Sequence, residues 1–263
     1  MSSLRSLAIV PSVSRVETAD EAGNPLVLRL QRLAALTAAD ISALEHLSLH
    51  PSRYGPRVDL IRDDVVPEDA VVVLEGFACR YRQRGNGRRQ IMAYLLPGDL
   101  CDVDAAYLGR MDHAVGTLSP CLTVRIPRQA LVDLIAHHPN IAHALRLAKL
   151  SEEATTREWI ANLGCRSALE RMAHLFCELM ARSEAVGLAQ DGSCPLPLTQ
   201  GDLGDTLGLS NVHVNRTLQE MRRHGWVELR GKSLRLLKPK QVQHVGEFSP
   251  SYLQPKSPSN VHF

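Results

Sequence analysis

The chain has few aromatic side chains: phenylalanine, tyrosine and tryptophan make up only 4% of its 263 residues. Its core must therefore be built mainly from leucine, valine, isoleucine and alanine. Hydrophobic residues at 44% and charged residues at 22% are the proportions of a folded globular protein, which excludes a disordered chain. The length allows one large domain or two ordinary domains, each with a core of its own.

The chain also lacks the motifs of common enzymes. It contains no P-loop, no HExxH, no GxSxG and no paired cysteine–histidine constellation, so we expect no enzymatic activity. The six cysteines form no CxxC pair and no zinc-like spacing, which indicates free thiols in a reducing compartment. These cysteines are Cys79, Cys101, Cys121, Cys165, Cys177 and Cys194.

Long hydrophobic runs are missing as well. No stretch of about 18 apolar residues is present, so we expect no membrane span. The N-terminal segment MSSLRSLAIVPS has an apolar run of four residues, which is too short for a signal peptide. We therefore expect a cytoplasmic protein without a membrane partner.

Basic residues are concentrated in one region near the C-terminus. Residues 199–240 contain eight lysines and arginines and four acidic residues, whereas the formal net charge of the whole chain is only +2. This region thus carries about +4 and the rest of the chain about −2. The concentration of positive charge predicts an acidic partner for this region.

The N-terminal half changes from helical to strand periodicity. Residues 26–49 predict two short helices, the second capped by Thr37. Over residues 57–127, short apolar runs are broken by glycine and proline, and Asn86-Gly87 is a strong hairpin signal. Residues 117–127 are typical of a closing strand. The pattern predicts a compact antiparallel barrel or roll.

Residues 126–163 return to helical periodicity, and Pro139 stands where a new helix can begin. A long helix this apolar between two domains is too hydrophobic for a bare spacer. Pairing with its copy in a second subunit would bury the apolar stripe; the alternative is a helix that lies on its own domain. The stripe consists of Leu145, Ala148, Leu150, Trp159, Ile160 and Leu163.

Two helix starts follow each other closely near the C-terminus. Thr199 precedes a short helix, Gly208 permits the left-handed turn that ends it, and Ser210 caps a second helix. Two helices joined by a short turn that contains glycine are the helix-turn-helix arrangement. Residues 226–236 then predict a hairpin wing whose basic tip, Arg230-Gly231-Lys232, suits backbone phosphate.

The second of these helices has two different faces. Val214, Leu218 and Met221 repeat at helical spacing and would seal it to the first helix. The opposite face carries asparagine, glutamine and arginine, which read base edges and bind phosphates, and a valine that can meet a thymine methyl group. The predicted DNA-binding residues are Thr199, Gln200, Ser210, Asn211, Val212, His213, Asn215, Arg216, Gln219, Arg222 and Lys232.

At these residues the chain resembles the Crp/Fnr family of bacterial transcription regulators. The segment LTQGDLGDTLGLSNVHVNRTLQEMRRHGWVELRGKSLRL is similar to that family's winged helix-turn-helix throughout, and the likeness covers about residues 26–238. The resemblance implies an α+β fold: an antiparallel, cyclic-nucleotide-binding-like β-roll, a long dimerisation helix and a winged helix-turn-helix. It implies a sequence-specific homodimer that binds two half-sites on double-stranded DNA and contacts RNA polymerase.

The resemblance also assigns roles and boundaries. Arg216 carries over as a base-reading position, and Val212 replaces the glutamate common in the family, so we expect a different half-site. The expected divisions are a flexible tail at 1–25, the β-roll sensor domain at 26–138, the dimerisation helix at 139–163, the winged helix-turn-helix at 164–238 and a second flexible tail at 239–263.

The sensor pocket departs from the family members that bind cyclic nucleotides. In those relatives a Gly-Glu pair reaches the ribose and an Arg-Ser pair holds the cyclic phosphate. Here Gly98-Asp99 resembles the first pair, but Met111-Asp112 stands at the second, where an aspartate would repel a phosphate. We expect a degenerate or altered effector site without a cyclic nucleotide. The alternative is a cyclic-nucleotide-responsive regulator that uses a shifted phosphate contact near Arg110. The candidate effector residues are Gly98, Asp99, Arg110, Met111, Asp112 and Thr156.

Other cofactors find little support. An iron–sulfur cluster needs closely spaced cysteines, which lie near the N-terminus in relatives, whereas the first cysteine here is Cys79. A haem would need axial ligands, for which His113 is a single candidate. Acidic neighbours disfavour the thiolate of Cys101. We therefore expect no cofactor. A cyclic-nucleotide regulatory protein that does not bind DNA is disfavoured by the basic helix-turn-helix.

Overall fold

The structure is a computed structural model that describes residues 23–101 and 110–253. Nearly all of the tail predicted at 1–25, and residues 254–263 of the tail predicted at 239–263, lie outside the described residues. No helix in the described part of the chain is long and apolar enough to cross a membrane.

Two short helices precede the sheets, as predicted. α1 (Pro25–Gln31) begins after Asn24, whose side chain accepts the amide of Leu26 at 3.0 Å. α2 (Ala38–Leu47) begins after Thr37, which forms a reciprocal capping box with the third residue of the helix. Leu26 and Leu30 of α1 and Leu44 of α2 pack in one core cluster with strands of the β-roll.

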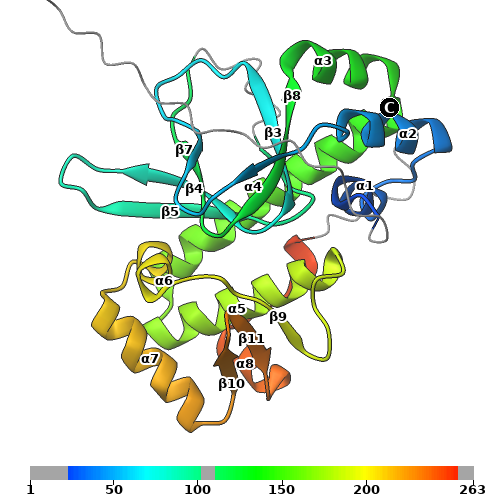
Figure 1. Ribbon diagram of the computed structural model, residues 1–263. Helices are drawn as coiled ribbons and strands as arrows, with labels where there is room; N and C mark the ends of the chain where they lie inside the picture. The colour runs from blue at the N-terminus through cyan, green and yellow to red at the C-terminus, as the bar shows by residue number, and fades with distance from the viewer. Residues whose placement is uncertain (1–22, 102–109, 254–263) are drawn as a thin grey trace, which may run out of the picture.

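Two four-stranded antiparallel sheets form the β-roll (Figure 1). The first has the order β1-β8-β3-β6, formed by Ser52–Tyr54, Cys121–Pro127, Asp69–Glu75 and Leu100–Cys101. The second has the order β2-β7-β4-β5, formed by Asp59–Ile61, Ala114–Thr117, Ala78–Gln83 and Arg89–Leu95. Val71 and Val73 of β3 pack between the sheets, whereas Val72 points to the helices, because successive residues of a strand face opposite sides.

The hairpin signal at Asn86-Gly87 is confirmed. β4 and β5 pair antiparallel, and the chain reverses between Arg84 and Arg88, whose backbone groups bond at 2.8 Å. Gly87 has a φ of +80°, a conformation that side chains other than glycine rarely adopt. Figure 1 shows that this hairpin projects from the β-roll toward the side on which α6 and α7 lie.

The long helix begins at Pro139, as predicted, and follows α3 (Arg128–His137). This helix, α4 (Pro139–Cys165), runs under the β-roll and leads into the C-terminal elements (Figure 1). Its predicted apolar stripe is divided: Leu145 and Trp159 are buried in the chain's own cores, because α4 packs against the β-roll at one end and α5 at the other. Leu150 and Ile160 are exposed by 36% and 66%.

The C-terminal elements form a winged helix-turn-helix around α5 (Ala168–Ala185). α6 (Gln200–Leu207) and α7 (Asn211–Arg223) are the two helices of the motif. The wing strands β10 (Val227–Arg230) and β11 (Ser233–Leu236) were predicted. The sheet has the order β10-β11-β9, and its third strand, β9 (Ser193–Pro195), was not predicted, because three residues show no readable period.

The prediction of a flexible tail from residue 239 onward is wrong for residues 239–253. The chain continues as α8 (Pro239–Val245) and the 3-10 turn η2 (Pro250–Tyr252). Val242 is fully buried against α5, and the Tyr252 hydroxyl donates to Glu178 at 3.0 Å. These two contacts order the segment, and the expected α+β fold is otherwise confirmed.

Candidate nucleic-acid interface

The first helix of the motif is fixed at its N-terminus by a buried carboxylate. Asp202 accepts the Thr199 amide at 2.9 Å and the Thr199 hydroxyl at 2.7 Å, and the Thr199 hydroxyl accepts the Asp202 amide at 3.1 Å. This reciprocal cap satisfies backbone donors that the helix leaves unpaired. Thr199 and Gln200 remain exposed at the helix start, with the amide end of the helix directed outward.

Two glycines shape the turn between the helices. Gly208 ends α6 in the left-handed conformation with a φ of +67°, as the sequence predicted. Gly204 was missed: a Cβ on it would lie 2.7 Å from the Leu209 carbonyl oxygen, so the chain can return past α6 only over a residue without a side chain. The signal for Gly204 was its spacing of four residues before Gly208.

The second helix is seated by its apolar face. The Ser210 side chain caps α7 by accepting the His213 amide at 3.3 Å. Val214, Leu218 and Met221 are 0–4% exposed and belong to the core that includes α5 and α6. The predicted division of the helix into two faces is thus present in the structure.

The opposite face of α7 lies open. Val212 is 77% exposed, whereas the other apolar side chains of α7 are buried. The remaining predicted side chains of this face are also exposed: Asn211, His213, Asn215, Arg216, Gln219 and Arg222. At the wing tip, Arg230 pairs with Glu228 at 2.8 Å, whereas Lys232 has a φ of +64° and an exposed side chain.

The Gly98-Asp99 pair, which resembles the ribose-contacting pair of cyclic-nucleotide-binding relatives, is engaged by other groups of the chain. Asp99 bonds Arg29 of α1 at 2.9 Å, Arg182 of α5 at 2.8 Å and the Leu96 amide at 2.7 Å. Burial would raise the pKa of Asp99, but the two guanidinium groups outweigh burial and hold the pKa below its usual value. Gly98 has a φ of +90°, and a Cβ there would lie 2.5 Å from the carbonyl oxygen of Pro25.

The six candidate effector residues do not form one site. Gly98, Asp99 and Thr156 line a cavity of about 590 Å³ between α1, β5, α4, α5 and η2. Met111 is 3% exposed in the core between the sheets, because its side chain is apolar. Arg110 is held by the Asp64 carboxylate at 3.1 Å, and Asp112 bonds His113 at 2.7 Å. Among the described residues, Arg110 and Asp112 thus bond neighbouring side chains and do not line this cavity.

Two family models match the chain, one to each half. A model described as the cyclic nucleotide-binding domain matches residues 52–138, and one described as the Crp-like helix-turn-helix domain matches residues 170–245. The nitrogen fixation regulation protein FixK of Bradyrhizobium diazoefficiens is 28% identical over 243 residues, which cover 89% of this chain and 97% of that protein. The chain belongs to the Crp/Fnr family of transcription regulators.

Further relatives agree with this assignment. The transcriptional activator protein FnrL of Cereibacter sphaeroides is 26% identical over 207 residues, which cover 76% of this chain and 80% of FnrL. The solved structure of FixK2 from Bradyrhizobium japonicum has the same fold, with a TM-score of 0.66 and 24% identity over 74% of this chain and 96% of that chain. Crp/Fnr regulators bind DNA and act as dimers, and these relatives are regulators rather than enzymes.

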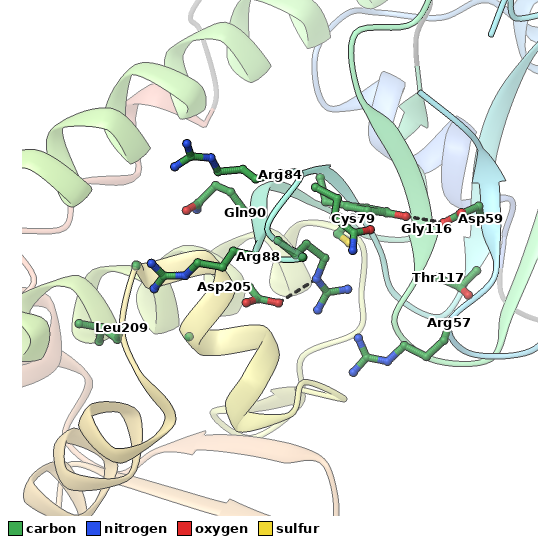
Figure 2. Close-up of a pocket in the computed structure, with 16 residues that line it drawn as sticks. Arg57, Asp59, Cys79, Arg84, Arg88, Gln90, Gly116, Thr117, Asp205 and Leu209 are labelled. Carbon is green, nitrogen blue, oxygen red and sulfur yellow. Dashed lines mark hydrogen bonds and ion pairs between the residues drawn. The ribbon is translucent and has the colours of Figure 1, made fainter. Parts of the chain in front are cut away.

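In this regulator the β-roll is joined directly to the helix-turn-helix, which the sequence did not reveal. Arg57 bonds both Asp202 oxygens at 2.8 and 2.9 Å. Arg89 of β5 bonds Asp202 at 2.6 Å and Asp205 at 2.8 Å (the dashed line to Asp205 in Figure 2). Burial would raise the pKa of Asp202, but the hydrogen bonds from Arg57, Thr199 and Arg89 lower it overall.

Four of the six cysteines have thiols whose pKa is raised by burial. Burial raises the pKa of Cys79 and Cys177 to about 12. Burial also raises the pKa of Cys121 and Cys194 to about 11, so these thiols stay protonated. Among the described residues, no group of three or more histidine, cysteine or acidic side chains is arranged to hold a metal ion.

Proposed function

We propose that the chain binds operator DNA as a homodimer, with the exposed face of α7 in the major groove. The observation that carries this proposal is the separation of faces on α7. Val214, Leu218 and Met221 are buried in the core on one face. The opposite face exposes asparagine, glutamine and arginine side chains and one valine that is 77% exposed. An exposed valine on this face can contact a thymine methyl group, and the asparagine, glutamine and arginine side chains beside it can bond base edges.

We assign different tasks to different residues. Arg216, Asn215 and Val212 would read base edges, and arginine bonds guanine through two N–H groups. Ser210, Thr199 and Lys232 surround that face at helix starts and at the wing tip, where backbone phosphate is bound. Gln200, Asn211, His213, Gln219 and Arg222 complete the proposed interface.

A homodimer through α4 is supported by the residues that α4 leaves exposed. Leu150 and Ile160 lie outside the chain's own cores and are 36% and 66% exposed. A second copy of α4 that packs on this side would bury both side chains. Two half-sites about one helical turn apart would then face two copies of α7. We also infer action in the cytoplasm and contact with RNA polymerase, as the family resemblance implies.

The proposed effector site is altered relative to cyclic-nucleotide-binding relatives. The acidic side chain that would bond a ribose is fully engaged by Arg29 and Arg182. The cavity of about 590 Å³ beside it remains the place where a small effector of another class would bind.

The test is Arg216→Ala on an operator selected from a random duplex library with the wild-type protein. We expect a loss of about 1–3 kcal/mol on that operator and a relaxed preference at one base pair in each half-site. Arg128→Ala, which removes an exposed arginine from α3, is the matched control and should leave both unchanged. Equal weakening on every sequence would show that Arg216 binds only phosphate, and absence of any wild-type binding would overturn the proposed function.

A further inference from the structure

The hairpin between β4 and β5 carries charge of one sign only. Residues 76–98 include five arginines and no aspartate or glutamate. Arg80 pairs with Glu152, and Arg89 pairs with Asp202 and Asp205. The guanidinium groups of Arg84 and Arg88 are exposed and make no hydrogen bond or ion pair to the described part of the chain. The hairpin tip therefore presents two arginines without a neutralising partner there.

The hairpin is held against the DNA-binding motif. Besides the ion pairs of Arg89, the Gln90 amide donates to the Thr206 carbonyl at 3.2 Å. Arg84 and Arg88 line one cavity of about 640 Å³ together with Gly208 and Leu209 of the turn in the motif. In Figure 2, the side chains of Arg84 and Arg88 extend toward the side of the view on which Leu209 lies.

The position of the turn decides which anion is within reach. Leu209 directly precedes Ser210, the cap of the recognition helix. When the start of that helix enters the major groove, the preceding turn lies at the groove edge, along which the phosphates of one strand run. Guanidinium groups at this edge match phosphate oxygens in both charge and geometry.

We propose that Arg84 and Arg88 bind backbone phosphates of the DNA beside the recognition helix. The interface then extends from the C-terminal domain onto the β-roll. This inference rests on the proposed function. The acidic Asp59 and Asp205 also line this cavity, so an anionic ligand enclosed in it would meet two carboxylates. Arg84 and Arg88 are both exposed and can reach a DNA strand that passes outside the cavity.

The contact has a regulatory consequence. Arg84 and Arg88 belong to the sensor domain, and they stay beside the helix-turn-helix as long as the contacts of Arg57, Arg89 and Gln90 with α6 hold. A movement that separates the two domains would remove two phosphate contacts at once. DNA affinity would fall without any change in α7.

The test compares Arg84→Ala/Arg88→Ala with wild type on a mixed-sequence duplex over a series of salt concentrations. Loss of two phosphate contacts should reduce the slope of log K against log salt by about 1.8 and weaken binding about 30-fold near 0.15 M salt, with the two lines converging near 1 M. The loss should be equal on a selected operator and on random sequence. Arg84→Lys/Arg88→Lys, which keeps both charges, should restore most of the slope.

The control is Arg62→Ala/Arg128→Ala, which removes two exposed arginines that are not part of the hairpin, one after β2 and one at the start of α3, and should keep the wild-type slope. An unchanged slope in the hairpin double variant overturns this inference alone, because wild-type binding then still supports the proposed function. Absence of wild-type binding overturns both. Binding of inorganic pyrophosphate that the double variant loses, together with an unchanged DNA slope, would identify a small-anion site and also overturn the inference.

Discussion

Asp202 is the residue through which the β-roll holds the DNA-binding motif, so its removal tests that connection. Its carboxylate is fully buried and accepts five hydrogen bonds: two from Thr199, two from Arg57 and one from Arg89. Asp202→Ala removes the carboxylate half of the α6 capping box, whereas the Thr199 hydroxyl can still accept the backbone amide of residue 202; this loss costs about 1 kcal/mol. The substitution also leaves two guanidinium groups without this partner.

The free-energy cost of leaving the two guanidinium groups without Asp202 is smaller than the cost of breaking a fully buried ion pair. Breaking such a pair costs about 3–5 kcal/mol. Here Arg57 is 46% exposed and regains water, and Arg89 keeps its bond to Asp205. Solvent screening reduces the contribution to about 1–2 kcal/mol. We therefore expect Asp202→Ala to lower the free energy of unfolding by about 2–3 kcal/mol.

Equilibrium unfolding in urea, followed by tryptophan fluorescence, measures this loss. Asp205→Ala is the matched control, because Asp205 is 33% exposed and makes one ion pair, with Arg89. This substitution should lower the free energy of unfolding by about 0.5 kcal/mol. A double-mutant cycle with Arg57→Ala isolates the contact between the domains. Equal small losses for Asp202→Ala and Asp205→Ala, or zero coupling between Asp202 and Arg57, would refute the reasoning.

Two further predictions concern single residues. Gly204→Ala should destabilise the protein by about 1–3 kcal/mol and weaken DNA binding, because the new Cβ would meet the Leu209 carbonyl oxygen. Gly201→Ala, whose Cβ would have ordinary contacts, should be neutral or stabilise the protein by about 0.5–1 kcal/mol. Urea unfolding of the two variants compares these effects, and equal effects would contradict the account of the turn. Cys165 is the one exposed thiol and should react first with a thiol reagent at about pH 8, while the buried thiols react only on unfolding. If a fast phase of thiol modification remains in Cys165→Ser, another cysteine is accessible in the folded protein.

Local signals in the sequence were enough to predict the helices and turns that form the candidate interface. The caps at Thr37, Thr199 and Ser210 and the turns at Asn86-Gly87 and Gly208 depend on neighbours within a few residues, and the structure has each of them. The same locality explains why the two faces of α7 could be assigned from residue spacing alone.

The contacts that the sequence could not show join residues far apart in the chain. Asp202 meets Arg57 across 145 positions, and Asp99 meets Arg182 across 83. No periodicity or motif links such pairs. The ordered segment 239–253 escaped prediction for the same reason, because its stability comes from the contact of Tyr252 with Glu178, and Gly204 escaped because its constraint is a backbone approach.

The occupation of Asp99 changes what an effector of this regulator could do. In cyclic-nucleotide-binding relatives the acidic residue at this place serves a ligand, but here one carboxylate joins α1 through Arg29 and α5 through Arg182. The link between the sensor and the DNA-binding domain is thus made by the chain's own side chains. The neighbouring cavity is lined by both of those helices and by Thr156 of α4. A ligand there would therefore act by changing the spacing of α1, α4 and α5, and the ion pairs of Asp99 would oppose that change.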